Sequence, residues 1–238
     1  MKIPVLLYHS ISNDNSNVSL NINQFENQII YLKKRNFKTI DFDNINNKKE
    51  KKIIITFDDS YKDLISNALP ILKKYEFNAT CFAVSNYLGS KNIWDLGKNN
   101  YVEKELMNKN DLREWVSNGM SVGSHTHNHH DLTKLNKNEI SNQLNKSKKI
   151  LENITGSEVI NFSYPYGKVN NLVYKMTKKY FKIATTTNRG RFDNNVHDLY
   201  LIPRIDMGKR LSFFKIFLKL QTYYEDLKFK NNELYLQM

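Results

Sequence analysis

The sequence has little of what stabilises small secreted proteins or anchors proteins across membranes. Its 238 residues include one cysteine, four prolines and eight glycines. A single cysteine excludes a disulfide framework within the chain, and the apolar run around Cys81 predicts a buried structural thiol. No run of about 18 apolar residues is present, so we expect no transmembrane helix.

The N-terminal apolar stretch is too short for an export signal, and it is interrupted by Pro4 and His9. From the chain as given we therefore expect a cytoplasmic protein, at most peripheral to the inner face of a membrane.

Acidic residues are fewer than basic ones, 24 against 36, which gives a net charge of +12. Charge runs usually mark solvated faces. The functional alternative is attraction to an anionic lipid, membrane surface or glycan. No helix-turn-helix, zinc-finger or RNA-binding signature is present, so nucleic acid is not an expected partner.

Short apolar runs alternate with amphipathic segments, as in parallel βαβ units. The pattern predicts strands at Ile3–Tyr8, Ile53–Phe57, Ala79–Val84, Ser121–Ser124, Val159–Ser163, Lys182–Thr186 and Tyr200–Ile205. It predicts helices at Asn23–Asn36, Tyr61–Tyr75, Asp111–Asn118, Lys137–Ile154, Val169–Tyr180 and Leu211–Phe229. We expect one catalytic domain over residues 1–238, with 211–238 as a C-terminal amphipathic helix and tail.

Capping residues, glycines and a proline mark several helix boundaries. Asn110 is expected to cap a helix, Gly119 and Gly156 to end helices in the left-handed conformation, and Pro70 to kink or split its helix. The polar region Ser85–Glu105 is expected to form a long functional loop.

The C-terminal helix candidate combines aromatic and basic residues. One interpretation is a barrel helix whose Phe and Leu side chains face the core. The alternative is a helix lying on an anionic membrane.

The chemically notable residues all follow predicted strands. They are His9, Asp58 and Asp59, His125 and His129, the turn Tyr164–Gly167, and Arg204. In a parallel barrel the carboxyl ends of the strands meet at one face, so we expect these side chains to converge.

Asp58 and Asp59 are adjacent carboxylates at the end of a buried strand. Because they repel each other, they need a cation or a shared proton. One can bind a metal ion while the other serves as a base. The alternative is that Asp59 or Ser60 caps the next helix.

Four of the six histidines lie between positions 125 and 130. The i, i+4 spacing of His125 and His129 would place both rings on one side of a helical turn. Neutral imidazole is a common ligand of zinc, so this cluster predicts a metal site. His127 and His130 are expected to face solvent or to support the ligands.

Pro165 and Gly167 predict a tight turn after a strand. Such a turn can direct backbone N–H groups at an oxyanion, and Tyr164 and Pro165 can line a sugar site. An ordinary aromatic turn is the alternative.

Together, Thr-Phe-Asp-Asp at 56–59, His-Thr-x-x-His at 125–129 and the 163–167 turn resemble the polysaccharide deacetylase family, carbohydrate esterase family four. The resemblance extends from about His9 to Arg204. It implies a distorted (β/α) barrel of seven or eight units and a divalent metal ion, zinc by default. It also implies Asp59, His125 and His129 as metal ligands, Asp58 as general base, and the Tyr166 N–H at the oxyanion.

The sequence departs from that family in two places. Ser163 stands where the family has an arginine that steadies the base, and Arg204 is our candidate replacement. The late histidine element that supplies the general acid is missing. The N-terminal Tyr8-His9-Ser10-Ile11 element resembles a branch in which His9 takes this role, with His197 as the fallback.

These residues predict a metal-dependent hydrolase that removes N-acetyl groups from an amino sugar in a glycan or lipid-linked saccharide. Trp94, in the long loop, is expected to line the sugar cleft. The alternatives are hydrolysis of a small cyclic amide and non-catalytic carbohydrate binding by the same fold. The intact Asp58–Asp59 pair argues against a pure binder.

Overall fold

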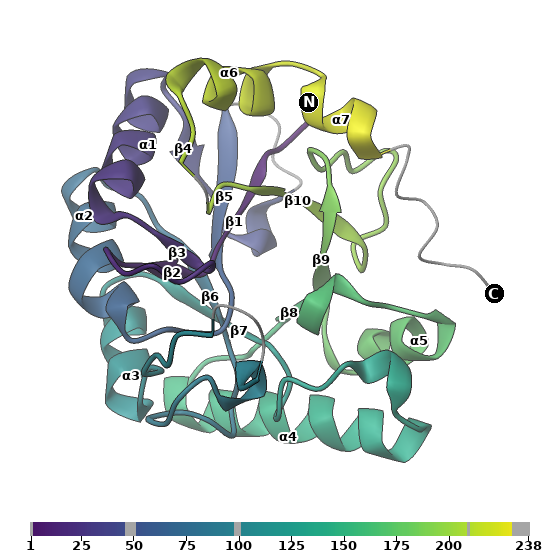
Figure 1. The fold of residues 1–238 in the computed structure, drawn as a ribbon. Coiled ribbons are helices and arrows are strands. Elements are labelled where there is room, and N and C mark those ends of the chain that lie inside the picture. Colours follow the sequence, from purple (N-terminus) through teal and green to yellow (C-terminus); the bar gives the residue numbers. More distant parts are fainter. Residues whose placement is uncertain (1, 46–50, 98–100, 209, 230–238) are drawn as a thin grey trace.

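A closed barrel of parallel strands organises the molecule (Figure 1). The computed structural model describes residues 2–45, 51–97, 101–208 and 210–229. The barrel strands are β1 (Val5–Tyr8), β5 (Lys52–Phe57), β6 (Thr80–Ala83), β7 (Ser121–Ser124), β8 (Asn161–Ser163), β9 (Ile183–Arg189) and β10 (Ile202–Asp206). The barrel closes because β1 pairs in parallel with both β10 and β5, so the first and last strands are neighbours. The predicted fold class is confirmed.

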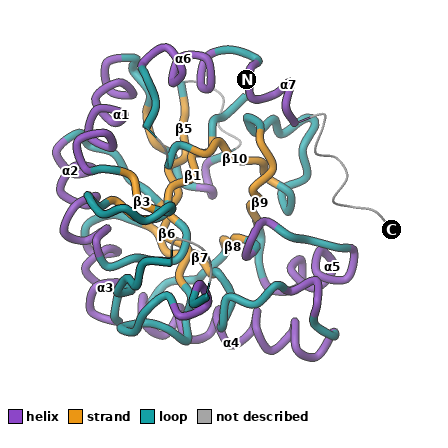
Figure 2. The backbone as a smooth tube through the Cα atoms, viewed as in Figure 1, coloured by secondary structure: helices purple, strands orange, loops and turns teal. Residues whose placement is uncertain are grey.

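Helices surround the barrel (Figure 2). They are α1 (Ile22–Lys34), α2 (Leu69–Lys74), α3 (Lys109–Ser117), α4 (Lys137–Thr155), α5 (Asn171–Tyr180), α6 (Phe213–Gln221) and α7 (Tyr224–Phe229). The short strands β2 (Ser10–Ile11), β3 (Ser19–Leu20) and β4 (Lys38–Thr39) were not predicted, because two residues are too few to show a period of two. None of the helices in the described ranges is long and apolar enough to cross a membrane.

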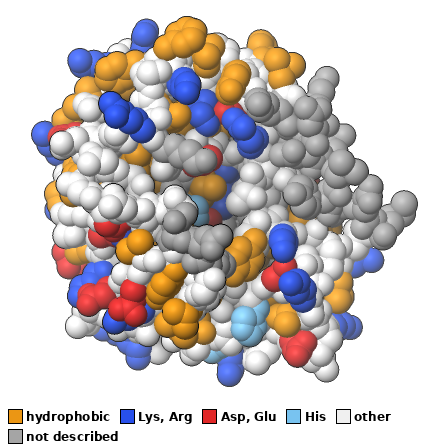
Figure 3. All heavy atoms as spheres, in the orientation of Figure 1, with side chains coloured by type: hydrophobic (Ala, Val, Ile, Leu, Met, Phe, Trp, Pro, Cys, Tyr) orange, Lys and Arg blue, Asp and Glu red, His pale blue; other side chains and the backbone are white. Residues whose placement is uncertain are grey.

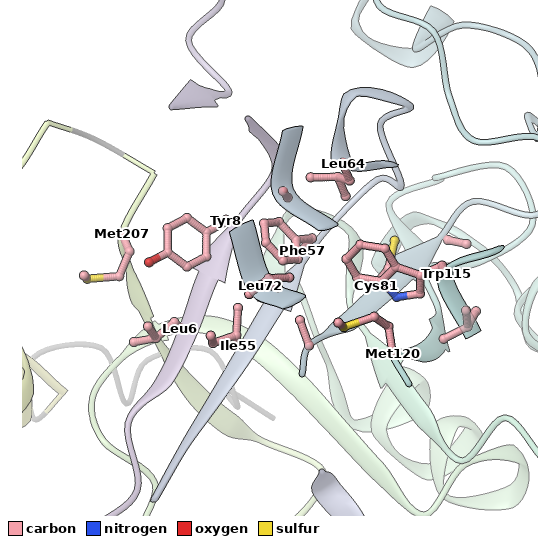
Figure 4. Packing of buried hydrophobic residues seen from close by; sticks show 14 of the residues in the cluster. Leu6, Tyr8, Ile55, Phe57, Leu64, Leu72, Cys81, Trp115, Met120 and Met207 are labelled. Carbon is pink, nitrogen blue, oxygen red and sulfur yellow. The ribbon is translucent and has the colours of Figure 1, made fainter. Parts of the chain in front are cut away.

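Two apolar clusters lie on opposite sides of the barrel wall. Ile53, Ile55 and Phe57 belong to the cluster shared with the helices, where Phe57 packs edge-on against Trp115 (Figure 4). Ile54, between them, belongs to the other cluster with Phe82 and Ile202. Side chains alternate along a strand, so the residues two and four positions after Ile54 share its side. This alternation brings Thr56 and then Asp58 to the inside of the barrel.

Gly123 makes room for a large ring in the barrel interior. A Cβ atom at this position would lie 2.5 Å from Cδ1 of Phe82 and 3.1 Å from the Asn161 carbonyl oxygen. Only a hydrogen fits in this space, so Gly123 allows β6 and β7 to pack around Phe82 without displacing either strand.

Two helix boundaries follow the expected chemistry and one differs. Gly119 and Gly156 have positive φ, as expected for residues that end helices. The cap of α3 is Asn108 rather than Asn110. The Asn108 side chain accepts the N–H group of Asp111, whose carboxylate accepts the Asn108 N–H in return. This reciprocal box fixes the helix start two residues before the expected cap.

Pro70 divides its helix as predicted. A π-helical segment, Leu64–Ala68, precedes it, and α2 begins at Leu69 with Pro70 in its first turn. Proline has no N–H group to donate to the preceding turn, so it is tolerated only at this kind of position.

The predicted single helix over 211–229 is wrong, because Thr222 is extended and separates α6 from α7. The break lets buried Glu225 accept two hydrogen bonds from the Arg189 guanidinium of β9. The expectation that the aromatic rings face the core is also wrong. Ile216 and Leu220 are buried, whereas the Phe rings of α6 are exposed.

We predict that Gly123→Ala destabilises the fold by about 1–3 kcal/mol, because the added methyl group collides with Phe82 and a carbonyl oxygen. Gly208→Ala is the matched control, since its Cβ would meet only Asp206 at 3.4 Å. Urea unfolding of the two variants measures the difference. Equal unfolding midpoints for both would contradict the packing described for Gly123.

Candidate active site

Three side chains from two strand ends converge on one point. Nε2 of His125 and Nε2 of His129 lie 3.5 Å and 3.3 Å from the same carboxylate oxygen, Oδ1 of Asp59. All three side chains are buried, and they are the only His, Cys, Asp and Glu side chains in the described ranges that group tightly enough to hold an ion. Tetrahedral ligands at about 2.1 Å from zinc lie about 3.4 Å apart, so this spacing suits one divalent ion.

Backbone strain concentrates at this cluster. Seven non-glycine residues in the described ranges have positive φ, and five of them are Asp59, Ser60, Thr126, His129 and Tyr166. Such conformations cost about 1–3 kcal/mol each and persist only where the surrounding structure enforces them. At Asp59 the positive φ separates the directions of the Asp58 and Asp59 carboxylates, so the two can contact different partners.

The ligand histidines are not related by a helical turn, contrary to the expectation from their spacing. Residues 125–130 form an irregular loop in which the His129 N–H donates to Oγ1 of Thr126 at 2.9 Å. This side-chain turn, rather than a helix, brings the two imidazole rings to a centroid distance of 4.8 Å. The spacing predicted the right pair for the wrong geometric reason.

Each ligand ring is oriented through its other nitrogen. Nδ1 of His125 lies 2.7 Å from the carbonyl oxygen of Ser163, so Nδ1 carries the hydrogen and Nε2 keeps its lone pair. Nδ1 of His129 lies 3.2 Å from the Tyr166 hydroxyl. Both contacts leave Nε2 directed toward Asp59, which is how metal-binding histidines are usually held.

The charge states fit a cation. Burial lowers the pKa of His125 to about 4, so its ring is neutral at neutral pH. Burial opposes ionisation of Asp59, but His129 and the other nearby histidines bring the pKa of Asp59 below its ordinary value. Oδ1 of Asp59 is buried and has no hydrogen-bond partner among the described residues. A buried, ionised and unpartnered oxygen facing Nε2 of two imidazole rings matches the donor set of a divalent metal ion.

Asp58 makes a different set of contacts, with Arg204. Both of its oxygens accept a hydrogen bond of 2.7 Å from the Arg204 guanidinium, which lies inside the barrel and is 1% exposed. Burial alone would raise the pKa of Asp58. The guanidinium outweighs burial and brings that pKa below its ordinary value, so Asp58 is an ionised carboxylate at neutral pH.

Ser163 explains how an arginine from β10 reaches Asp58. Its hydroxyl accepts a hydrogen bond from Nη2 of Arg204 at 3.0 Å and lies 3.3 Å from Oδ2 of Asp58. A long side chain at position 163 would occupy the space that the guanidinium fills. The structure therefore places Arg204 where we expected a replacement for the missing family arginine.

The two candidate acids lie at opposite ends of the barrel. His9 follows β1 and is half-buried, and it lies close enough to interact electrostatically with both Asp58 and Asp59. His197 instead accepts the N–H of Asp193 at 3.0 Å, near the N-terminal ends of the strands. The structure does not bring His197 to the metal ligands, and the fallback is therefore wrong.

An open cleft of about 460 Å³ lies beside the cluster. Figure 3 shows a hollow near the centre of the same face. Trp94, Tyr166 and His129 line the cleft, and Trp94 stacks on His129 with ring centroids 4.7 Å apart. Tyr87, which the sequence did not single out, also lines it and packs against Trp94. Its place in the same loop as Trp94 was the available signal.

The exposed cleft edge contains further polar residues that the sequence did not assign to a substrate. Asp131, Lys134 and Lys168 line it together with His130, which is exposed as expected. His127 is partly exposed, and its Nδ1 lies 2.9 Å from Oγ of Ser85.

The turn after β8 presents one of its aromatic rings to the cleft. Tyr166 has φ 60° and its ring is exposed, whereas Tyr164 is fully buried against Phe162. Pro165 is also buried, so neither Tyr164 nor Pro165 lines the cleft, contrary to expectation. Gly167 is required beside them, since a Cβ atom there would lie 2.0 Å from Oγ1 of Thr187.

Comparison with known proteins points to one family. The family model described as polysaccharide deacetylase matches residues 45–181. A poly-beta-1,6-N-acetyl-D-glucosamine N-deacetylase of Staphylococcus aureus is 31% identical over 216 residues, which cover 84% of this chain and 71% of the relative.

Solved structures agree with the sequence comparison. A polysaccharide deacetylase from Bacillus cereus superposes with a TM-score of 0.81 at 28% identity, covering 93% of this chain and 69% of that one. The Streptococcus pyogenes deacetylase PplD, in complex with acetate, gives a TM-score of 0.79 at 25% identity and covers 93% and 99% of the two chains.

We predict that zinc raises the unfolding temperature of chelator-treated protein and that Asp59→Ala abolishes this response. Ion binding to the folded state alone contributes about 2.7 kcal/mol at a hundredfold excess over Kd. His130→Ala is the control, because this exposed ring is outside the ligand cluster. Thermal unfolding with and without zinc reports the result. An undiminished zinc response in Asp59→Ala would place the ion elsewhere.

We predict that Arg204→Met destabilises the fold by about 3–5 kcal/mol, because it leaves the Asp58 carboxylate buried without its partner. Adding Asp58→Asn should recover part of the loss, since the uncompensated charge is then absent. A double-mutant cycle in urea measures this coupling, and Arg113→Met on the surface of α3 is the control. Additive losses from the two substitutions would show that the pair is not coupled.

Proposed function

This chain belongs to the polysaccharide deacetylase family, and from that premise we propose that it removes N-acetyl groups from an amino-sugar glycan by metal-dependent hydrolysis. The observation that carries the proposal is that the two adjacent carboxylates have different partners. Asp59 faces Nε2 of two imidazole rings, while Asp58 is held apart by Arg204.

Asp59, His125 and His129 would hold the ion and leave further coordination positions open. The chemistry that a divalent ion supplies at such a site is polarisation of a carbonyl group and a lowered pKa for water. Zinc is the favoured ion, because two imidazoles and a carboxylate suit it well.

Asp58 would accept the proton of the attacking water. Its ionised state, maintained by Arg204, makes it ready as a base at neutral pH. Water adds to the acetyl carbonyl carbon, and the backbone N–H of Tyr166 would stabilise the resulting oxyanion. His9 would donate a proton to the leaving nitrogen as the carbon–nitrogen bond breaks, giving acetate and a free amine.

The cleft favours a sugar chain over a small cyclic amide. Trp94, Tyr87 and Tyr166 offer aromatic surfaces to the apolar faces of pyranose rings, and the outer edge of the cleft is exposed rather than enclosed. The Staphylococcus aureus relative acts, by its name, on poly-beta-1,6-N-acetyl-D-glucosamine. We therefore propose a β-linked N-acetylglucosamine polymer as the substrate class. A non-catalytic binder would have no need for the ionised Asp58 beside the cluster.

We expect Asp58→Asn to retain bound metal and to lose at least a hundredfold in acetate release from N-acetylglucosamine oligomers, because proton transfer contributes about that much. His9→Ala should lower kcat, because the proton donor acts on the leaving group. Metal content and KM should stay nearly unchanged. Metal analysis and acetate assays on zinc-loaded protein separate the two effects.

His130→Ala, at the cleft edge but outside the proposed chemistry, is the control for these assays. Wild-type rates in Asp58→Asn would show that Asp58 is not the base. Wild-type rates in His9→Ala would show that His9 is not the acid. Stoichiometric metal without acetate release from any oligomer would favour the cyclic-amide or binding alternatives.

A further inference from the structure

Exposed apolar side chains gather on the two C-terminal helices. The aromatic surface consists of Phe213, Phe214 and Phe217 of α6 with Tyr223 and Leu227, each between 36% and 68% exposed. Orange side chains are seen at the edge of the molecule where α6 lies in Figure 1. Exposed apolar surface of this kind marks an interaction site more often than an isolated exposed residue does.

The aromatic surface is held in place by the fold. The Phe213 ring stacks on Tyr31 of α1, with centroids 6.0 Å apart and planes 15° from parallel. The Tyr31 hydroxyl accepts a hydrogen bond of 2.7 Å from Nε2 of Gln221, at the end of α6. The outer rings are therefore presented on an anchored helix whose opposite side, with Ile216 and Leu220, is buried.

A cationic pocket adjoins the aromatic surface. This cavity of about 400 Å³ shares Tyr223 with the surface and is lined by Lys2, Lys51, Lys52 and Arg191, with Asp193 as its only acidic lining residue in the described ranges. Asp226 pairs with Lys2 and Arg191 from outside the pocket lining, so the described residues place four cations and two carboxylates here.

We propose that the aromatic surface and the cationic pocket together dock this protein on a bilayer that contains anionic phospholipids. Aromatic rings suit the headgroup boundary, and the clustered cations complement lipid phosphates. The net charge of +12 adds a long-range attraction between the protein and the negatively charged bilayer.

The position of α6 and α7 relative to the cleft leaves the cleft accessible when the protein is bound to a membrane. The cleft residues follow β6, β7 and β8, whereas α6 follows β10 and packs on α1. Strands β10 and β1 lie across the barrel from β7, as Figure 1 shows. A glycan could therefore reach the cleft while α6 and α7 lie against lipid.

Vesicle co-sedimentation tests the proposal. Wild-type protein should bind vesicles of phosphatidylglycerol and phosphatidylcholine at low salt, and should bind pure phosphatidylcholine at least tenfold more weakly. Phe214→Ser/Phe217→Ser should reduce binding to the anionic vesicles at least tenfold. Lys51→Glu in the pocket, combined with Lys215→Glu at an exposed lysine of α6, should reduce it several-fold and flatten its salt dependence.

Two matched control variants separate the effect of this surface from the effects of overall surface hydrophobicity and net charge. Leu172→Ser/Val196→Ser removes exposed apolar side chains elsewhere, and Lys175→Glu/Lys179→Glu makes the same charge change on α5. Both should bind as wild type does, and all four variants should keep the wild-type unfolding temperature. Acetate release from soluble oligomers should also be unchanged, so a failure of this proposal is distinguishable from a failure of the proposed function.

Four results would overturn the proposal. The first is no binding of wild type to anionic vesicles. The second is equal loss in the test and control variants. The third is self-association of wild type in sedimentation velocity, abolished by Phe214→Ser/Phe217→Ser without any vesicle binding, which would make a second copy of the chain the occupant. Full displacement from vesicles by millimolar inorganic phosphate would assign the pocket to a soluble anion instead.

Discussion

The ion pair between Arg204 and Asp58 is the interaction on which the rest of the site depends. A buried ion pair is worth little unless its remaining hydrogen-bonding groups are satisfied. Here Nε of Arg204 donates to the Thr186 carbonyl oxygen, Nη1 to Oγ1 of Thr56, and Nη2 to Oγ of Ser163. One guanidinium thereby connects β5, β8, β9 and β10, and the same contacts that satisfy it fix the position and charge of Asp58.

This connection extends to the metal ligands. Ser163 contacts the guanidinium through its hydroxyl and His125 through its carbonyl oxygen, so the partner of Asp58 and the ring of His125 are positioned by the same residue. Positive φ at Asp59 turns its carboxylate toward the two imidazoles. Two neighbouring carboxylates thus have separate partners, and their mutual repulsion is offset by a guanidinium on one side and a cation site on the other.

Much of this could be predicted from the sequence, because period-two apolar runs and strand-end clusters are local signals. The barrel strands and the convergence of the strand-end side chains followed from them. The set of Asp59, His125 and His129 as ligands and the approach of Arg204 to Asp58 followed from the resemblance to the deacetylase family. The loop at 125–130 did not, since its conformation depends on a hydrogen bond from the His129 N–H to Thr126. The burial of Tyr164 and the break at Thr222 depend on packing between segments distant in sequence, which a local pattern does not encode. The roles given to Asp58, His9, Tyr166 and Arg204 in catalysis stay predictions.

The most direct test is a crystal structure of zinc-loaded protein with anomalous data at the zinc edge. We predict one strong peak within about 2.0–2.2 Å of Oδ1 of Asp59, Nε2 of His125 and Nε2 of His129, with the Asp58–Arg204 pair unbroken beside it. A peak bound by Asp58, or by His127 and His130, or no ordered zinc in the barrel mouth, would contradict it.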